Sequence, residues 1–252
     1  MGEFEGRVAF VTGGNSGIGR AAAVAFGREG ASVAVVARRR VEGEAAASEV
    51  RAAGGQAIFI GADVTIEEEV RSAVETAVGA FGGIDIAFNN AGTWTPAPFA
   101  EVSTELWERE IAVNLTSVFL SMRHEIPAME RRGGGVIVNN ASVLGLVGVG
   151  AGLAPYVAAK HGVVGLGRAT ALEYAASGIR INTIAPAGVD TPQYRATFGA
   201  AREPHDVFVG MHPVGRLATP EEIASLVLYL ASDQAGFFSG TALAMDGAWS
   251  AG

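Results

Sequence analysis

Short hydrophobic runs alternate along the chain with longer stretches in which hydrophobic positions recur at helical spacing. The short runs are rich in Val, Ile and Ala and contain few polar residues, which is typical of strands buried on both faces. They cover residues 7–12, 32–37, 56–64, 84–90, 135–142 and 179–186, with a weaker candidate at 241–247. The stretches with helical spacing cover residues 17–29, 41–53, 67–81, 103–131, 156–176 and 219–232.

This alternation of strands and helices predicts βαβ crossovers and therefore a doubly wound parallel sheet. We expect an α/β fold of the Rossmann-like type with about seven strands flanked by helices, formed by residues 1–252 as a single domain. Residues 191–218 break the regular pattern, and we expect them to form a mobile flap beside the ligand site. The chain has no internal repeat, no low-complexity block and no linker rich in Pro and Ser.

The composition adds information about partners. Of the 252 residues, 49% are hydrophobic and 17% are charged, which predicts a large core and apolar surface covered by other subunits. The formal net charge of −8 argues against nucleic acid and anionic membranes as partners, because both attract clustered basic residues. The chain contains no cysteine, which excludes disulfides and thiolate ligands, and we expect no metal site.

One hydrophobic segment, residues 141–159, approaches the length of a membrane span, which needs about 20 apolar residues. It contains four glycines and a proline, so a strand end, a loop and a helix start fit it better. Residues 1–10 are acidic and run directly into a predicted strand, unlike a signal peptide. We therefore expect a cytoplasmic protein without a membrane partner.

A glycine-rich stretch, TGGNSGIGR at residues 12–20, follows the first strand and opens the first helix. Glycines at this place let the backbone turn tightly and approach a pyrophosphate, whose charge suits the N-terminus of a helix. A tight turn without any ligand is the alternative. The candidate phosphate contacts are Gly13, Asn15, Ser16, Gly17, Ile18 and Gly19.

The end of the second strand indicates which dinucleotide fits. NAD sites usually carry an acidic residue about 20 positions after the glycine motif, where it binds the ribose hydroxyls. Here Ala37 stands at that place and is followed by Arg38, Arg39 and Arg40. A guanidinium without a competing carboxylate suits a 2′-phosphate, so NADP is favoured over NAD, with Arg38 and Arg39 as candidate contacts. A solvated loop is the alternative for Arg39 and Arg40.

Two further strand ends carry candidate cofactor contacts. Asp63, followed by Val64, is placed to accept a hydrogen bond from an adenine amino group, although it also suits the cap of the next helix. The small residues after Asn90, namely Ala91 and Gly92, would let a flat cofactor lie against the backbone; an Asn-rich turn is the alternative.

The candidate catalytic residues lie at the same edge of the predicted sheet. Ser142 closes the fifth strand, and Tyr156 and Lys160 stand four residues apart on the next helix, where they share one face. Asn114 lies in the middle of a helix, an unfavourable place for asparagine unless its amide has a function. Each of the four has a structural alternative, but strand ends and helix starts meet where ligands bind in such folds.

These motifs, in this order and spacing, resemble the short-chain dehydrogenase/reductase family over essentially the whole chain. The matching elements are TGGNSGIG (12–19), Asp63, NNAG (89–92), Asn114, Ser142, YVAAK (156–160) and PAGVDT (186–191). The resemblance implies that Tyr156 exchanges a proton with the substrate oxygen, that Ser142 binds this oxygen, and that Lys160 holds the nicotinamide ribose. It also implies that Asn114 positions a water. A nearby ammonium should lower the pKa of the tyrosine, which is ordinarily about 10.

The nicotinamide side of the site is implied by the same resemblance. Its candidate contacts are Pro186, Gly188, Val189 and Thr191, together with Tyr156 and Lys160. The chain departs from the family where Ala187 replaces a common glycine, and near its end where Ala248 and Trp249 follow Asp246-Gly247. Neither departure removes a chemical group.

The sequence therefore predicts an NADP-preferring oxidoreductase that interconverts a ketone and a secondary alcohol. The spacing of Tyr156 and Lys160 favours this chemistry over that of the enoyl reductases. A mostly apolar pocket wall predicts a hydrophobic or modestly polar substrate. The candidate wall residues are Ser142, Trp94, Leu144, Leu146, Phe198, Phe208 and Met211.

Two alternatives remain. A 3-oxoacyl-carrier-protein reductase would need a basic docking patch, for which Arg123, Arg131 and Arg132 are candidates. A sensor that binds NADP without turnover would predict loss of Tyr156 or Lys160, and both are present. By resemblance, the protein is expected to be a homotetramer.

Overall fold

The computed structural model describes residues 2–198 and 202–251 and contains, within them, one sheet of seven parallel strands. The order across the sheet is β3-β2-β1-β4-β5-β6-β7, so the chain first builds outward from β1 in one direction and then from β4 in the other. The strands are β1 (Val8–Thr12), β2 (Ser32–Ala37), β3 (Gln56–Gly61), β4 (Ile86–Asn89), β5 (Gly135–Asn140), β6 (Ile179–Pro186) and β7 (Ala242–Met245). The predicted doubly wound fold is confirmed.

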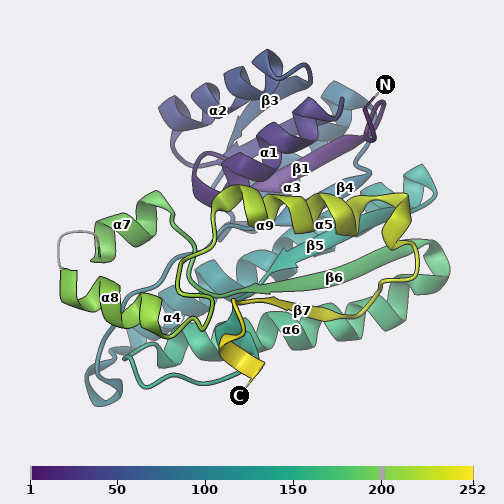
Figure 1. The fold of residues 1–252 in the computed structure, drawn as a ribbon. Coiled ribbons are helices and arrows are strands. Elements are labelled where there is room, and N and C mark those ends of the chain that lie inside the picture. Colours follow the sequence, from purple (N-terminus) through teal and green to yellow (C-terminus); the bar gives the residue numbers. More distant parts are fainter. Residues whose placement is uncertain (1, 199–201, 252) are drawn as a thin grey trace.

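Helices cover both faces of the sheet (Figure 1). One layer contains α1 (Gly17–Arg28), α2 (Arg40–Ala52) and α9 (Pro220–Ala231). The other layer contains α3 (Glu67–Phe81), α4 (Thr104–Ile111), α5 (Ser117–Arg132) and α6 (Ala154–Tyr174). Neighbouring residues of one strand serve opposite layers: Val11 packs in the first core cluster and Phe10 in the second, both nearly inaccessible to water. The unbroken hydrophobic runs are explained by this double burial.

Two predicted elements differ from the structure. The stretch at 103–131 is divided into α4 and α5 by a π-helical turn, Ala112–Thr116, which contains Asn114. The segment at 191–218, which breaks the regular sequence pattern and was expected to form a mobile flap beside the ligand site, contains α7 (Pro192–Phe198) and α8 (Arg202–Gly210). Residues 199–201 of that segment lie outside the described part of the chain.

A polar cluster is enclosed in the core behind the edge where β4 and β5 end. Asn89 donates hydrogen bonds from Nδ2 to Glu125 Oε2 at 3.0 Å and to Asn139 Oδ1 at 3.1 Å. Glu125 is completely buried, and this burial raises the pKa of its carboxyl to about 8. The cluster therefore contains an acid that is largely protonated at neutral pH.

Among the helices in the described residues, none combines the length and the apolar character that crossing a membrane requires.

Candidate active site

The carboxyl ends of the central strands meet at one edge of the sheet, beside α7 and α8 (Figure 1). A cavity of about 640 Å³ opens there. It is lined by every predicted cofactor contact except Gly19, and by the predicted pocket residues Ser142, Trp94, Leu144, Phe198 and Phe208. Asn114 lies behind the wall and is fully buried. The structure thus brings segments from 13 to 208 into one site.

The glycine-rich turn forms one end of the cavity. Gly13 and Gly17 have positive φ angles of +63° and +51°, a conformation that favours glycine. A side chain on Gly19 would place its Cβ 2.3 Å from the Gly13 carbonyl oxygen, so Gly19 packs beneath the turn. Ser16 precedes α1 and makes no capping hydrogen bond through its side chain. The turn is therefore shaped to bind an anionic group at the start of α1.

Two arginines flank the adjoining part of the cavity. Arg38 Nη1 lies 3.5 Å from Asp63 Oδ2, and its side chain is 71% exposed. With its amide oxygen turned toward the guanidinium, Asn15 accepts hydrogen bonds from Arg39 Nε and Nη2 at 3.1 and 3.0 Å. Arg39 is thus held at the cavity. Arg40 lies elsewhere, 3.6 Å from Glu44 and with its guanidinium carbon 5.7 Å from the centre of the Phe59 ring.

Asp63 is held in its ionised form. Burial acts to raise the pKa of this carboxyl, but hydrogen bonds from Thr65 and the charge of Arg38 outweigh it, and the net shift is downward. Both the backbone N–H and the hydroxyl of Thr65 donate to Asp63 Oδ1, at 3.0 and 2.7 Å. Asp63 therefore closes a local turn with Thr65 and lines the cavity, but it does not cap α3, whose N-cap residue is Ile66.

Ser142, Tyr156 and Lys160 share one wall of the cavity. The Ser142 hydroxyl accepts a hydrogen bond from Leu144 N at 3.1 Å and donates to the Pro186 carbonyl oxygen at 3.4 Å. Pro155 is the second residue of α6, and the half-buried Tyr156 follows it in the first turn of this helix. Lys160, one turn later, is only 3% exposed and donates from Nζ to the Asn140 carbonyl oxygen at 2.8 Å.

The electrostatics of this pair differ from expectation. Burial raises the pKa of Tyr156 to about 12, even though a hydrogen bond with Ser142 acts to lower it. Burial also lowers the pKa of Lys160 to about 8, against the opposing effect of Glu110. The expected lowering of the tyrosine pKa by the lysine is therefore absent from this structure. The reason is geometric, because Nζ is directed to a backbone carbonyl and lies 5.5 Å from the centre of the phenol ring.

Lys160 is also the single lysine in the chain. Every other basic position that is permanently charged is an arginine. A guanidinium cannot lose its proton in a protein, whereas a buried ammonium can. The chain therefore contains one titratable side-chain amine, and it lies in the cavity.

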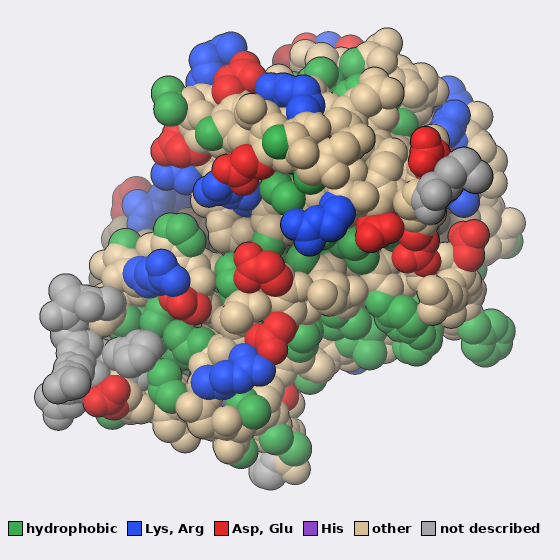
Figure 2. All heavy atoms as spheres, turned by 45° about the horizontal axis from the view of Figure 1, so that its top comes forward, with side chains coloured by type: hydrophobic (Ala, Val, Ile, Leu, Met, Phe, Trp, Pro, Cys, Tyr) green, Lys and Arg blue, Asp and Glu red, His purple; other side chains and the backbone are tan. Residues whose placement is uncertain are grey.

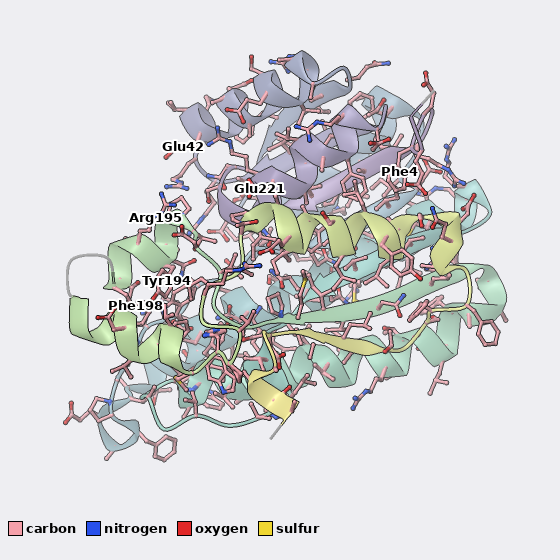
Figure 3. All side chains as sticks on the ribbon, in the orientation of Figure 1. Phe4, Glu42, Tyr194, Arg195, Phe198 and Glu221 are labelled. Carbon is pink, nitrogen blue, oxygen red and sulfur yellow. The ribbon has the colours of Figure 1, made fainter. Side chains whose placement is uncertain are left out.

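Aromatic rings form the wall opposite the glycine-rich turn. Phe198 of α7 stacks on Phe208 of α8 with ring centres 5.5 Å apart, and Tyr194 lies 5.1 Å from Phe198 (Figure 3). Trp249, near the C-terminus, lies 5.8 Å from Phe208. On the other side, Trp94 meets Tyr156 edge to face at 6.3 Å. Sequence reasoning missed Tyr194, because only the packing of α7 against α8 brings it to the cavity.

Two predicted wall residues lie outside the cavity. Leu146 packs against the core layer that contains α5 and α6. Met211 lies in the turn directly after α8. The buried side chain of this turn is that of the next residue, His212, which is 3% exposed. Leu153 and Trp249, by contrast, do line the cavity.

The basic residues considered for a docking patch are largely neutralised. Arg132 binds Asp85 at 3.0 Å, and Arg123 Nε lies 3.3 Å from Glu67. On the face drawn in Figure 2, acidic and basic side chains are interspersed and neither sign forms a continuous area. The geometry therefore gives little support to an acidic carrier protein as a partner.

The chain is similar to known proteins over nearly its whole length. A family model described as "Enoyl-(Acyl carrier protein) reductase" matches residues 13–250. Cyclohexanol dehydrogenase of Acinetobacter sp. (strain SE19) is 44% identical over 248 residues, which cover 98% of this chain and 96% of that protein. Cis-4-hydroxycyclohexanecarboxylate dehydrogenase of Sinomonas cyclohexanicum is 42% identical over the full length of both chains. The crystal structure of levodione reductase superposes with a TM-score of 0.94 at 35% identity, covering 98% of this chain and 99% of that one.

Proposed function

Because the chain belongs to the short-chain dehydrogenase/reductase family, we propose that it interconverts a ring-borne secondary alcohol and its ketone with a nicotinamide cofactor. The observation that carries this proposal is the wall shared by Ser142, Tyr156 and Lys160 in a cavity whose other end is the glycine-rich turn. A hydride donor and a proton donor are the two groups that carbonyl reduction requires, and this cavity has room for both.

Each residue of this wall has a separate role in the proposed reaction. The bound nicotinamide supplies or accepts the hydride. Tyr156 gives a proton to the carbonyl oxygen during reduction and removes it during alcohol oxidation. Ser142 donates a hydrogen bond to the same oxygen as negative charge develops on it. Lys160 would hold the cofactor ribose and stabilise the Tyr156 phenolate, and Asn114 would position a water that passes protons to Lys160.

The substrate side of the cavity suits an alicyclic ring. Trp94, Phe198, Phe208 and Trp249 offer flat apolar surface within the same cavity as Tyr156. Relatives named for cyclohexanol and for a hydroxycyclohexanecarboxylate share more than 40% of this sequence. Both names denote a hydroxyl on a six-membered carbocycle. A six-membered ring with one secondary hydroxyl is therefore the proposed substrate class.

We assign NADP as the preferred cofactor. Arg38 and Arg39 both line the cavity next to Ala37, where an NAD site usually carries an acidic residue. Arg39 is oriented by Asn15, and Arg38 is free to leave Asp63 because that ion pair is largely exposed to solvent. Two guanidiniums at this place would bind a 2′-phosphate through charge-assisted hydrogen bonds.

The test is a steady-state assay in both directions with NADP and NAD cofactors. Cyclohexanol, cis-4-hydroxycyclohexanecarboxylate, an open-chain secondary alcohol and a 3-oxoacyl thioester would be compared. Highest kcat/KM for either cyclic alcohol supports the proposed substrate class, and highest kcat/KM for the open-chain alcohol keeps the reaction but changes the substrate class. Preference for the thioester would favour the carrier-protein alternative. Tight cofactor binding without any turnover would favour the sensor.

We also propose that the protein is a cytoplasmic homotetramer. Large hydrophobic side chains are exposed on the single chain, among them Leu172 at 85% and Phe237 at 105% of full exposure. Hydrophobic side chains gather at the lower right of the face in Figure 2. Surface of this kind is usually covered by a partner, and light scattering coupled to size-exclusion chromatography gives the subunit number directly.

A further inference from the structure

Glu110, near the end of α4, is a buried acid that the proposed mechanism does not use. Its side chain is 0% exposed, and its Oε1 has no hydrogen-bond partner within the part of the chain that the structure describes. Burying a carboxyl in this way costs free energy unless nearby groups compensate for the lost water. Glu110 therefore requires an explanation from its surroundings.

The neighbouring π-helical turn connects Glu110 to Asn114. Asn114 donates from Nδ2 both to the Glu110 backbone carbonyl at 3.0 Å and to Glu110 Oε2 at 3.1 Å. Because both protons of the amide are used by one residue, Oδ1 must point the other way, and there it accepts from Thr93 N at 3.1 Å. Single π-helical turns occur frequently at functional sites. Glu110 thus determines which end of the Asn114 amide faces the cavity.

Gly92 lies beside both Asn114 and Lys160. A Cβ built on Gly92 would lie 3.0 Å from Asn114 Oδ1 and 3.5 Å from Lys160 Nζ, so both polar atoms border the same spot. An amide oxygen at this spot is an acceptor that faces an ammonium donor. If the amide were reversed, two donors would face each other instead.

The charge of Glu110 reaches the same residues. Burial raises the pKa of the Glu110 carboxyl, whereas Thr95 of the loop after β4, Arg109 of α4, Asn114 of the π turn and Lys160 of α6 act to lower it. In return, the Glu110 carboxylate acts to raise the pKa of both Tyr156 and Lys160. Among the described residues, the charged and titratable groups that interact with Glu110 are thus Arg109, Tyr156 and Lys160.

We propose that Glu110 is a positioning residue of this active site, which orients the Asn114 amide through two hydrogen bonds and acts on Lys160 through its negative charge. This inference rests on the proposed function for its kinetic consequence, but its electrostatic part is independent of turnover. No substrate atom contacts Glu110 in this scheme. It acts through the two residues that stand between it and the cofactor.

The single lysine makes a direct test possible. In protein labelled with ¹³C-lysine, the Cε resonance reports the titration of Lys160 alone. Glu110→Gln and Glu110→Ala remove the charge, and we expect the Lys160 titration to move to lower pH by about one unit. Glu110→Asp keeps the charge and should remain closer to the wild type. Glu108→Gln, at an exposed position of the same helix, is the matched control and should not move it.

The kinetic arm uses the alcohol and cofactor that the wild type prefers. In Glu110→Gln, the rate of alcohol oxidation should begin to increase at a lower pH than in the wild type. We expect kcat to be about ten-fold lower and KM to be nearly unchanged. An unchanged Lys160 titration in a folded neutral variant, or failure of both neutral variants to fold, overturns the proposal. A wild type without turnover would instead contradict the proposed function, and the resonance would still decide the role of Glu110.

Discussion

His212 accepts a hydrogen bond at Nε2 from the backbone N–H of Gly188, at 2.9 Å. Since Nε2 is the acceptor, the ring proton is on Nδ1, which lies 2.9 Å from the Phe208 carbonyl oxygen. The imidazole therefore joins the end of α8 to the loop after β6. That loop lines the cavity at Pro186 and Gly188.

His212→Ala should weaken cofactor binding. The variant leaves the buried Gly188 N–H without an acceptor, which costs about 1–3 kcal/mol, and it loosens the loop that faces the nicotinamide. We expect a dissociation constant for the cofactor about ten-fold higher, measured by quenching of tryptophan fluorescence. Met211→Ala, one residue away and outside the cavity, should bind like the wild type. Equal affinity of His212→Ala and the wild type would show that Gly188 does not depend on this bond.

Tyr156→Phe should remove turnover and retain the cofactor. General acid–base catalysis contributes about 10²–10⁴-fold, so we expect kcat to fall within this range. The ring, its packing against Trp94 and the cofactor contacts of Lys160 are all kept, and the affinity for the cofactor should change less than about three-fold. Tyr229→Phe, which alters a hydroxyl far from the cavity, is the control. Full activity in Tyr156→Phe would mean that another group transfers the proton.

The double variant Arg38→Ala/Arg39→Ala should reverse the cofactor preference. Loss of two charge-assisted contacts to a phosphate predicts a decrease of about 10–100-fold in kcat/KM for NADPH. The value for NADH should change little, because NADH carries no 2′-phosphate. Arg40→Ala is the matched control, since Arg40 pairs with Glu44 away from the cavity. A wild type that already prefers NADH would contradict the assignment before any variant is made.

The raised pKa of the Glu125 carboxyl determines how the free energy of unfolding should depend on pH. Its pKa is about 8 in the folded chain, against 4.5 ordinarily, so the folded state holds the proton more tightly than the unfolded state. This contribution to stability is complete below the ordinary value and is lost as the pH rises toward the folded value. Between these two pKa values, the free energy of unfolding should fall by about 1.4 kcal/mol per pH unit for one proton. Urea unfolding of Glu125→Gln at fixed protein concentration should show a flatter profile.

Glu130→Gln serves as the control for this measurement, because Glu130 is exposed on the same helix. Its profile should run parallel to that of the wild type. If Glu125→Gln also runs parallel, the Glu125 carboxyl is ionised in the folded protein and the polar cluster with Asn89 is arranged differently.

The fold and the chemistry-bearing strand ends were predictable because they depend on local pattern. Hydrophobic runs place the limits of β1, β2 and β6 within one residue of those observed, since burial on both faces makes each strand a continuous apolar run with polar ends. The predicted cofactor contacts are brought together for the same reason. In a parallel sheet, residues that end successive strands must lie at one edge.

Features that depend on packing between distant segments were not predictable. Glu110 looks like one of several acids on an amphipathic helix, and only the π-helical turn brings it to Asn114. Tyr194 reaches the cavity only through the packing of α7 against α8. The raised pKa of Tyr156 was missed because the direction of the Lys160 side chain toward Asn140 is a tertiary property.

A chain with one lysine, and that one only 3% exposed, has practical consequences for handling the protein. Reagents that acylate amines therefore find almost no accessible side-chain amine on the described surface. Dye esters and activated resins should couple poorly to the side chains of this protein.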